Sequence, residues 1–131
     1  MTESRLSVGR KTLAFAAIVE VGTGFALIVD PALVIRLLLG TNDFEQLLPV
    51  ARCFGVALLA LGLACWPSPG AGNGSPALRG MLTYNLLIAL FLAYIGVVER
   101  VAGLLLWPAV GVHAVVALLL ARSWPVAARD T

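Results

Sequence analysis

Apolar residues fall into four long stretches along the chain, with polar residues gathered between them. The stretches cover residues 12–29, 47–66, 81–98 and 101–121 and contain 18, 20, 18 and 21 residues. About 20 apolar residues are needed to cross a bilayer core as a helix, and lipid admits only helices or closed barrels. Since no stretch alternates apolar and polar residues as a barrel strand does, the pattern predicts an all-α integral membrane protein, a single domain over residues 1–131 built as a four-helix bundle.

A shorter apolar segment, residues 31–39, lies between the first two stretches. It follows Asp30 and Pro31, which are residue types that begin helices, and it precedes Gly40, a residue type that ends them. This segment is too short to span a bilayer. We therefore expect a short helix in the outer interface, with Arg36 extending toward the lipid headgroups.

The other connections differ in character. Residues 66–80 are rich in Pro, Gly and Ser, which predicts a mobile cytoplasmic loop. The last two stretches are nearly continuous, which predicts a tight helical hairpin closed near Glu99 and Arg100. Pro108 cannot donate to the carbonyl of Leu104, which predicts a kink in the last helix or a carbonyl that lines a cavity.

Composition agrees with a membrane protein and gives it an orientation. The chain is 60% hydrophobic and 12% charged, with a mean hydropathy of +0.98, which excludes a disordered chain, a coiled coil and a nucleic-acid binder. The positive-inside rule then predicts that both termini are cytoplasmic. Six basic residues lie on the cytoplasmic side of this topology and two lie outside, respectively Arg5, Arg10, Lys11, Arg79, Arg122 and Arg129 against Arg36 and Arg100.

Each long stretch also contains a polar residue, which is costly in hydrocarbon. Small residues share a helical face with these polar residues, as on the packed side of membrane helices. We therefore expect one polar cluster inside the bundle, formed by Glu20, Arg52, Tyr84, Asn85 and His113.

Two interpretations of this cluster stay open. In the first, Glu20 pairs with Arg52 or His113 and the polar residues only fix the helix register. In the second, Glu20 is the centre of a small cavity that binds a ligand or a proton. The sequence contains no glycine-rich phosphate loop, no Ser/His/Asp set and no His/Cys cluster. We therefore expect no cofactor and no metal, and the pattern leans against an enzyme without deciding the point.

The first half of the chain resembles small bacterial four-helix membrane proteins of unknown function that are loosely related to the DoxX-like group. The resemblance covers residues 15–62 and is carried by Glu20, Asp30-Pro31, Leu39-Gly40, Ala51-Arg52-Cys53-Phe54-Gly55 and Leu61-Gly62. It implies a four-helix fold in the bacterial inner membrane. DoxX members have been linked to quinone-coupled sulfur oxidation, but none of their catalytic residues can be placed on this chain.

The first helix is also similar to that of the small multidrug resistance transporters, over residues 17–23. That likeness implies that Glu20 is a shared site for protons and cationic drugs in an antiparallel dimer. The chain departs from this family in lacking its aromatic-glycine pattern in residues 84–96 and in its strong charge bias.

Three functions follow as candidates. The first is a scaffold or accessory subunit whose polar residues are structural. The second is a binder or enzyme subunit for a lipophilic molecule such as a quinone or sterol-like lipid. The third is a proton-coupled exporter. The expected partners are the lipid bilayer, a lipophilic ligand, and a membrane protein or second copy of this chain; nucleic acid is not expected, because the basic residues are scattered.

Overall fold

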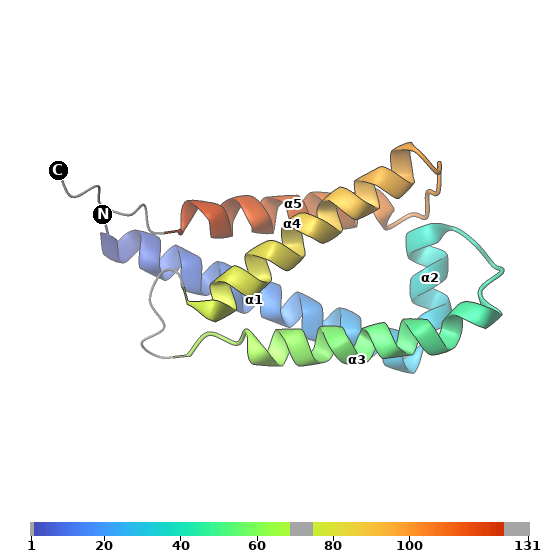
Figure 1. Cartoon of the computed structure of the whole chain (residues 1–131), viewed down its shortest axis with the longest axis horizontal. Coiled ribbons are helices and arrows are strands. Elements are labelled where there is room, and N and C mark those ends of the chain that lie inside the picture. Colours follow the sequence, from blue (N-terminus) through green and yellow to red (C-terminus); the bar gives the residue numbers. More distant parts are fainter. Residues whose placement is uncertain (1, 69–74, 125–131) are drawn as a thin grey trace.

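The structure is a computed structural model that describes residues 2–68 and 75–124, with side chains from residue 7 onward. The described residues are helical and contain no strand, so the predicted all-α class is confirmed. Four helices run side by side in alternating directions, and the short helix α2 lies across one end (Figure 1). We call this the α2 end, and the opposite end, where α1 begins and α5 ends, the basic end. The α-helices are α1 (Thr2–Val29), α2 (Pro31–Leu39), α3 (Leu48–Ala64), α4 (Pro76–Val97) and α5 (Leu106–Arg122), with a 3-10 turn, η1 (Glu45–Leu47), before α3.

Three helical segments are long and apolar enough to cross a membrane. They are Ser7–Val29, Glu45–Ala64 and Pro76–Val97. The fourth long helix, α5, has 17 residues. At a rise of 1.5 Å per residue it is ~26 Å long, slightly less than a hydrocarbon core of about 30 Å.

The short helix α2 has the predicted bounds, for the predicted reasons. The Asp30 carboxylate accepts a hydrogen bond from the amide of Leu33 at 3.0 Å, and Pro31 occupies the first turn. Gly40 ends the helix with φ at 71°, a left-handed conformation that favours glycine. Local capping chemistry therefore determines both ends of this helix.

The prediction of a tight hairpin between the last two helices is wrong. Eight residues, 98–105, separate α4 from α5. The amides of Gly103 and Leu105 donate to the carbonyls of Leu38 and Leu37, at 3.1 and 2.8 Å. These are carbonyls that the end of α2 leaves without helical partners. The connection is therefore paired with α2 rather than continued as helix.

The predicted kink at Pro108 is also wrong. Helix α5 begins at Leu106, so Pro108 lies in its first turn. A backbone amide has no partner within the helix at that position, and proline therefore costs nothing there.

Helix α4 begins earlier than predicted. Ser75 caps it by accepting a hydrogen bond from the amide of Leu78 at 3.3 Å, and Pro76 occupies the first turn. The last part of the predicted loop 66–80 is therefore helical. Residues 69–74 of that loop lie outside the described residues.

The long helices pack as two pairs, α1 with α3 and α4 with α5. Glycines bring α1 and α3 together: a Cβ atom at Gly24, Gly55 or Gly62 would lie 2.6, 2.7 or 2.8 Å from a backbone oxygen of the facing helix. Small residues permit this close approach of helices. The two backbones are therefore in direct contact along much of their length.

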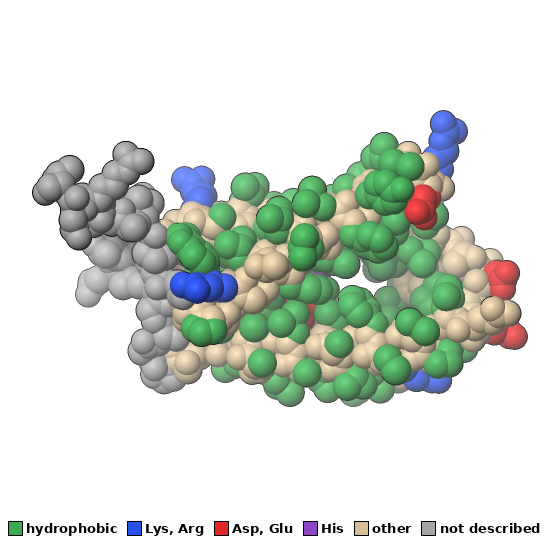
Figure 2. All heavy atoms as spheres, viewed as in Figure 1, with side chains coloured by type: hydrophobic (Ala, Val, Ile, Leu, Met, Phe, Trp, Pro, Cys, Tyr) green, Lys and Arg blue, Asp and Glu red, His purple; other side chains and the backbone are tan. Residues whose placement is uncertain are grey.

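The two helix pairs join through two separate apolar clusters. The basic-end cluster consists of Leu13, Ala16, Ala17, Cys65, Leu78, Met81, Val116 and Leu120. The α2-end cluster consists of Leu92, Ile95 and Leu106, with Leu38, Leu39, Ile88, Ala109 and Val110 packed against them. Within the described residues, α3 and α4 make almost no contact with each other. Figure 2 shows a hollow between them, which we call the α3–α4 opening.

Candidate functional site

A layer of polar side chains lies between the two apolar clusters. On α4, Met81 belongs to the basic-end cluster and Leu92 to the α2-end cluster, and Asn85 is buried between them. On α5, His113 likewise lies between Val110 and Val116 of those clusters. The polar layer consists of Glu20 from α1, Tyr84 and Asn85 from α4, and His113 from α5.

Asn85 determines which ring nitrogen of His113 carries a proton. The amide nitrogen of Asn85 donates to the carbonyl of Met81 at 2.8 Å, so its Oδ1 is the atom that faces His113. Oδ1 lies 2.8 Å from Nδ1 of His113. Since an amide oxygen can only accept, Nδ1 must donate. Asn85 therefore orients the ring and places a proton on Nδ1.

Glu20 is the most deeply placed ionisable residue of the layer, with 1% of its surface exposed. Its Oε1 atom is 3.9 Å from Nδ1 of His113, beyond hydrogen-bonding distance. The Tyr84 hydroxyl lies within reach of the carboxyl group, and the Tyr84 ring meets His113 edge-on with centroids 5.9 Å apart. Among the described residues Oε1 has no hydrogen-bond partner. This is unusual, because buried polar atoms are almost always paired.

Arg52 does not belong to this layer, so its predicted place in the cluster is wrong, and of the two partners considered for Glu20 it is the one that the structure places elsewhere. Its side chain is exposed, and Nε donates to the carbonyl of Ile28 at 3.3 Å. Ile28 is eight residues after Glu20, a distance of ~12 Å along α1. The register of α3 on α1 explains the separation: Gly55 faces Gly24 and Leu27, which places Arg52 nearer the α2 end.

The polar layer is visible through the α3–α4 opening. Figure 2 shows histidine and acidic side-chain atoms at the bottom of the hollow, with hydrophobic side chains around it. The chain has one histidine, and the His113 side chain is 12% exposed. His113 thus retains some exposure, whereas Glu20 and Asn85 are almost fully buried.

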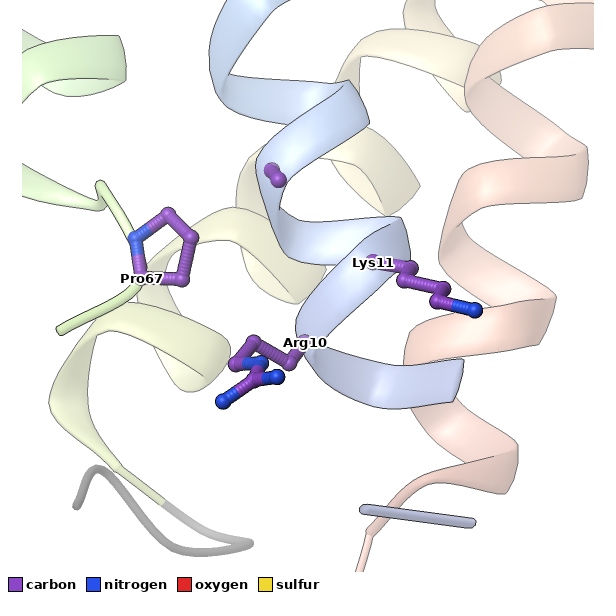
Figure 3. Close-up of a pocket in the computed structure, with 4 residues that line it drawn as sticks. Arg10, Lys11 and Pro67 are labelled. Carbon is purple, nitrogen blue, oxygen red and sulfur yellow. The ribbon is translucent and has the colours of Figure 1, made fainter. Parts of the chain in front are cut away.

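A second depression lies at the basic end and is lined by Arg10, Lys11, Ala14 and Pro67 (Figure 3). In this view Arg10 lies on the side of Pro67, whereas Lys11 points to the other side of α1. Ala16 and Ala17 of the basic-end cluster, which are almost fully buried, lie between this depression and Glu20 along α1. Buried alanines of α1 therefore separate the depression from Glu20 along the helix.

The chemistry available in the layer is hydrogen bonding and proton exchange by one carboxyl, one imidazole, one phenol and one amide. Within the described residues, no three metal-ligating side chains lie together. All four residues of the layer are among those that the sequence predicts. The α3–α4 opening was not predicted, because an apolar helix face carries no signal of whether it meets lipid or another helix.

Comparison of the chain with protein-family models, with curated proteins and with solved structures finds no match. The resemblances to DoxX-like proteins and to small multidrug resistance transporters therefore stay hypotheses.

Proposed function

We propose that the chain is a multi-pass protein of a cell's inner membrane, with α1, α3, α4 and α5 across the bilayer, α2 in the outer interface and the basic end in the cytoplasm. The distribution of charge supports this orientation. Among the residues whose side chains are described, the basic end carries Arg10, Lys11, Arg79 and Arg122 and no acidic residue. The α2 end carries four acidic residues and three basic ones, namely Asp30, Asp43, Glu45 and Glu99 with Arg36, Arg52 and Arg100.

The outer surface of the helices supports insertion into lipid. Large apolar side chains are widely exposed, such as Phe25 at 63%, Leu87 at 61% and Leu118 at 64%. Apolar patches of this extent are unfavourable in water, whereas acyl chains cover them at no cost. Figure 2 shows hydrophobic side chains along the middle of the visible face, with charged side chains gathered toward the ends of its described part.

The function that the geometry supports best is binding of a lipophilic molecule with a polar head group. Such a molecule enters sideways from the bilayer through the α3–α4 opening, and its head group reaches the polar layer. The observation that carries this proposal is the buried Oε1 atom of Glu20, which has no partner among the described residues. A purely structural layer predicts a fully paired carboxyl group. Of the two partners considered for Glu20, Arg52 lies elsewhere, and Nδ1 of His113 is 3.9 Å from Oε1 and bonded to Asn85.

The ligand class follows from the shape of the site. Ligand sites are mostly apolar, with a few polar groups that orient the ligand. Here the α3–α4 opening supplies the apolar part of the site and the polar layer supplies the polar part. Quinones and sterol-like lipids, which combine an apolar body with a polar head group, match this arrangement. The proton-coupled exporter has less support as a function. The apolar basic-end cluster lies between the polar layer and the proposed cytoplasmic side.

The test is ligand-induced stabilisation of the purified protein in lipid nanodiscs. A short-tailed quinone and a sterol are added to wild type, to Glu20→Gln and to Glu45→Gln. The last is a matched control, because Glu45 is exposed and remote from the layer. We expect at least one probe to raise the Tm of wild type and Glu45→Gln but not that of Glu20→Gln, since a ligand stabilises only the state that binds it. A Tm that neither probe changes in wild type contradicts the proposal.

The proposed orientation has its own test by cysteine labelling. In a Cys53→Ala/Cys65→Ala background, a cysteine at Asp43 is expected to react with an impermeant maleimide in intact cells. A cysteine at Ser68, at the other end of α3, is expected to react only after the cells are opened. The reverse pattern contradicts the orientation.

A further inference from the structure

The hydrogen-bond donors of the polar layer are turned toward groups of the layer itself. The Nδ1 proton of His113 is used by Asn85, and the amide nitrogen of Asn85 is used by the carbonyl of Met81. The Tyr84 hydroxyl faces Glu20. Apart from the second N–H of the Asn85 amide, the donors of the layer are therefore already directed at groups of the layer itself.

Acceptor capacity, by contrast, is left over at Glu20. A carboxylate offers two oxygens with about four lone-pair sites. The groups that face it are both donors, the Tyr84 hydroxyl and the more distant Nδ1 of His113 at 3.9 Å. A carboxyl oxygen that accepts matches this environment, and Oε1 has no donor among the described residues.

We infer that the ligand presents a hydrogen-bond donor, namely a phenolic or alcoholic hydroxyl group, to Oε1 of Glu20. This inference rests on the proposed function and narrows its ligand class. A ligand whose head group carries only carbonyl or ether oxygens would place an acceptor against an acceptor and leave Oε1 unpaired, which is unfavourable in a buried site. The site therefore favours a hydroquinone or a sterol alcohol over the corresponding quinone or ketone.

The experiment compares two probes that differ in one donor. para-Decylphenol and its methyl ether have the same ring and chain, but only the phenol has a hydroxyl hydrogen. Apparent affinities are obtained from the rise of Tm with the mole fraction of probe in nanodiscs. We expect wild type and Glu45→Gln to bind the phenol about tenfold more tightly than the ether, as one additional hydrogen bond in a buried site implies.

Glu20→Gln sharpens the test, because the glutamine amide replaces one of the two oxygens by an NH2 donor, to which the ether oxygen can also accept a hydrogen bond. The preference for the phenol is expected to fall by most of its tenfold value in this variant. A preference unchanged by Glu20→Gln overturns the inference. If Glu20→Gln does not fold, Tyr84→Phe replaces it. Removal of the Tyr84 hydroxyl frees a further acceptor position on Glu20, so the preference for the phenol over the ether is expected to persist. Loss of that preference in Tyr84→Phe overturns the inference.

The outcomes separate the two proposals. Equal binding of phenol and ether by wild type overturns the inference and leaves the proposed binding function standing. Failure of the phenol, the ether, the quinone and the sterol to stabilise wild type overturns both.

Discussion

Helix α1 has two packed faces of opposite character. On one face Gly24 meets Gly55 of α3, and the backbones touch without any polar side chain between them. On the other face Glu20 meets α4 and α5 and leaves a carboxylate oxygen unpaired in the interior. The α1–α3 face therefore holds the fold together, whereas the polar layer keeps an unmet hydrogen-bonding capacity, as the proposed binding function requires.

The surroundings of the two faces differ in the same way. The α1–α3 contact is continuous, whereas the polar layer interrupts the apolar packing between the basic-end and α2-end clusters. Close packing and complete pairing stabilise a membrane bundle, and an unpaired buried oxygen does not. Four substitutions test this contrast, from the largest expected effect on stability to the smallest.

Gly24→Ala should destabilise the protein most, by about 3 kcal/mol, because overpacking a close contact forces the backbones apart. The new Cβ atom would lie 2.6 Å from the carbonyl oxygen of Gly55. Gly22→Ala is the matched control, since a Cβ atom there meets nothing within 4 Å. Reversible unfolding in mixed detergent measures both variants. Equal stability of the two would refute the close α1–α3 contact.

Asn85→Leu should cost about 2 kcal/mol, because it leaves the buried Nδ1 proton of His113 without an acceptor. The bond that is lost is 2.8 Å long. Thr83→Val, on the exposed side of the same helix, should leave stability nearly unchanged. The same unfolding assay applies, and an Asn85→Leu protein as stable as Thr83→Val would show that the Asn85–His113 bond contributes nothing.

Glu20→Gln should change the free energy of unfolding by no more than about 1 kcal/mol, in either direction, because the substitution keeps the shape and removes a charge that lacks a full set of partners. The comparison with Asn85→Leu matters most here. A loss clearly larger than that of Asn85→Leu would mean that the carboxylate is fully paired and structural.

Arg52→Leu should have the smallest effect, within about 0.5 kcal/mol, as expected for an exposed side chain. Its hydrogen bond to the carbonyl of Ile28 is on the surface. In a double-mutant cycle with Glu20→Gln, the two substitutions should be additive within about 0.5 kcal/mol, as for distant sites. A measured coupling above 1 kcal/mol would place Arg52 beside Glu20. It would then support the interpretation in which the polar cluster is purely structural.

Much of the fold follows from local features of the sequence. The apolar stretches identify the four long helices, and the capping residues Asp30 and Gly40 define α2 at its observed bounds. The burial of Glu20 and Asn85 also follows, because polar residues in apolar helices turn toward the protein interior. These features depend on a helix and its own side chains, and a linear pattern contains that information.

Tertiary structure alone decided which residues meet. Arg52 and His113 were equally plausible partners of Glu20 in the sequence, and the register set by Gly24 on Gly55 moved Arg52 toward Ile28. Residues 98–105 form a longer connection than the predicted tight hairpin because they pair with α2. That pairing depends on carbonyls more than sixty residues earlier in the chain. The α3–α4 opening arises because both helices have better partners in α1 and α5. Contacts between distant segments depend on the sum of all interfaces, and no single stretch of sequence encodes that sum.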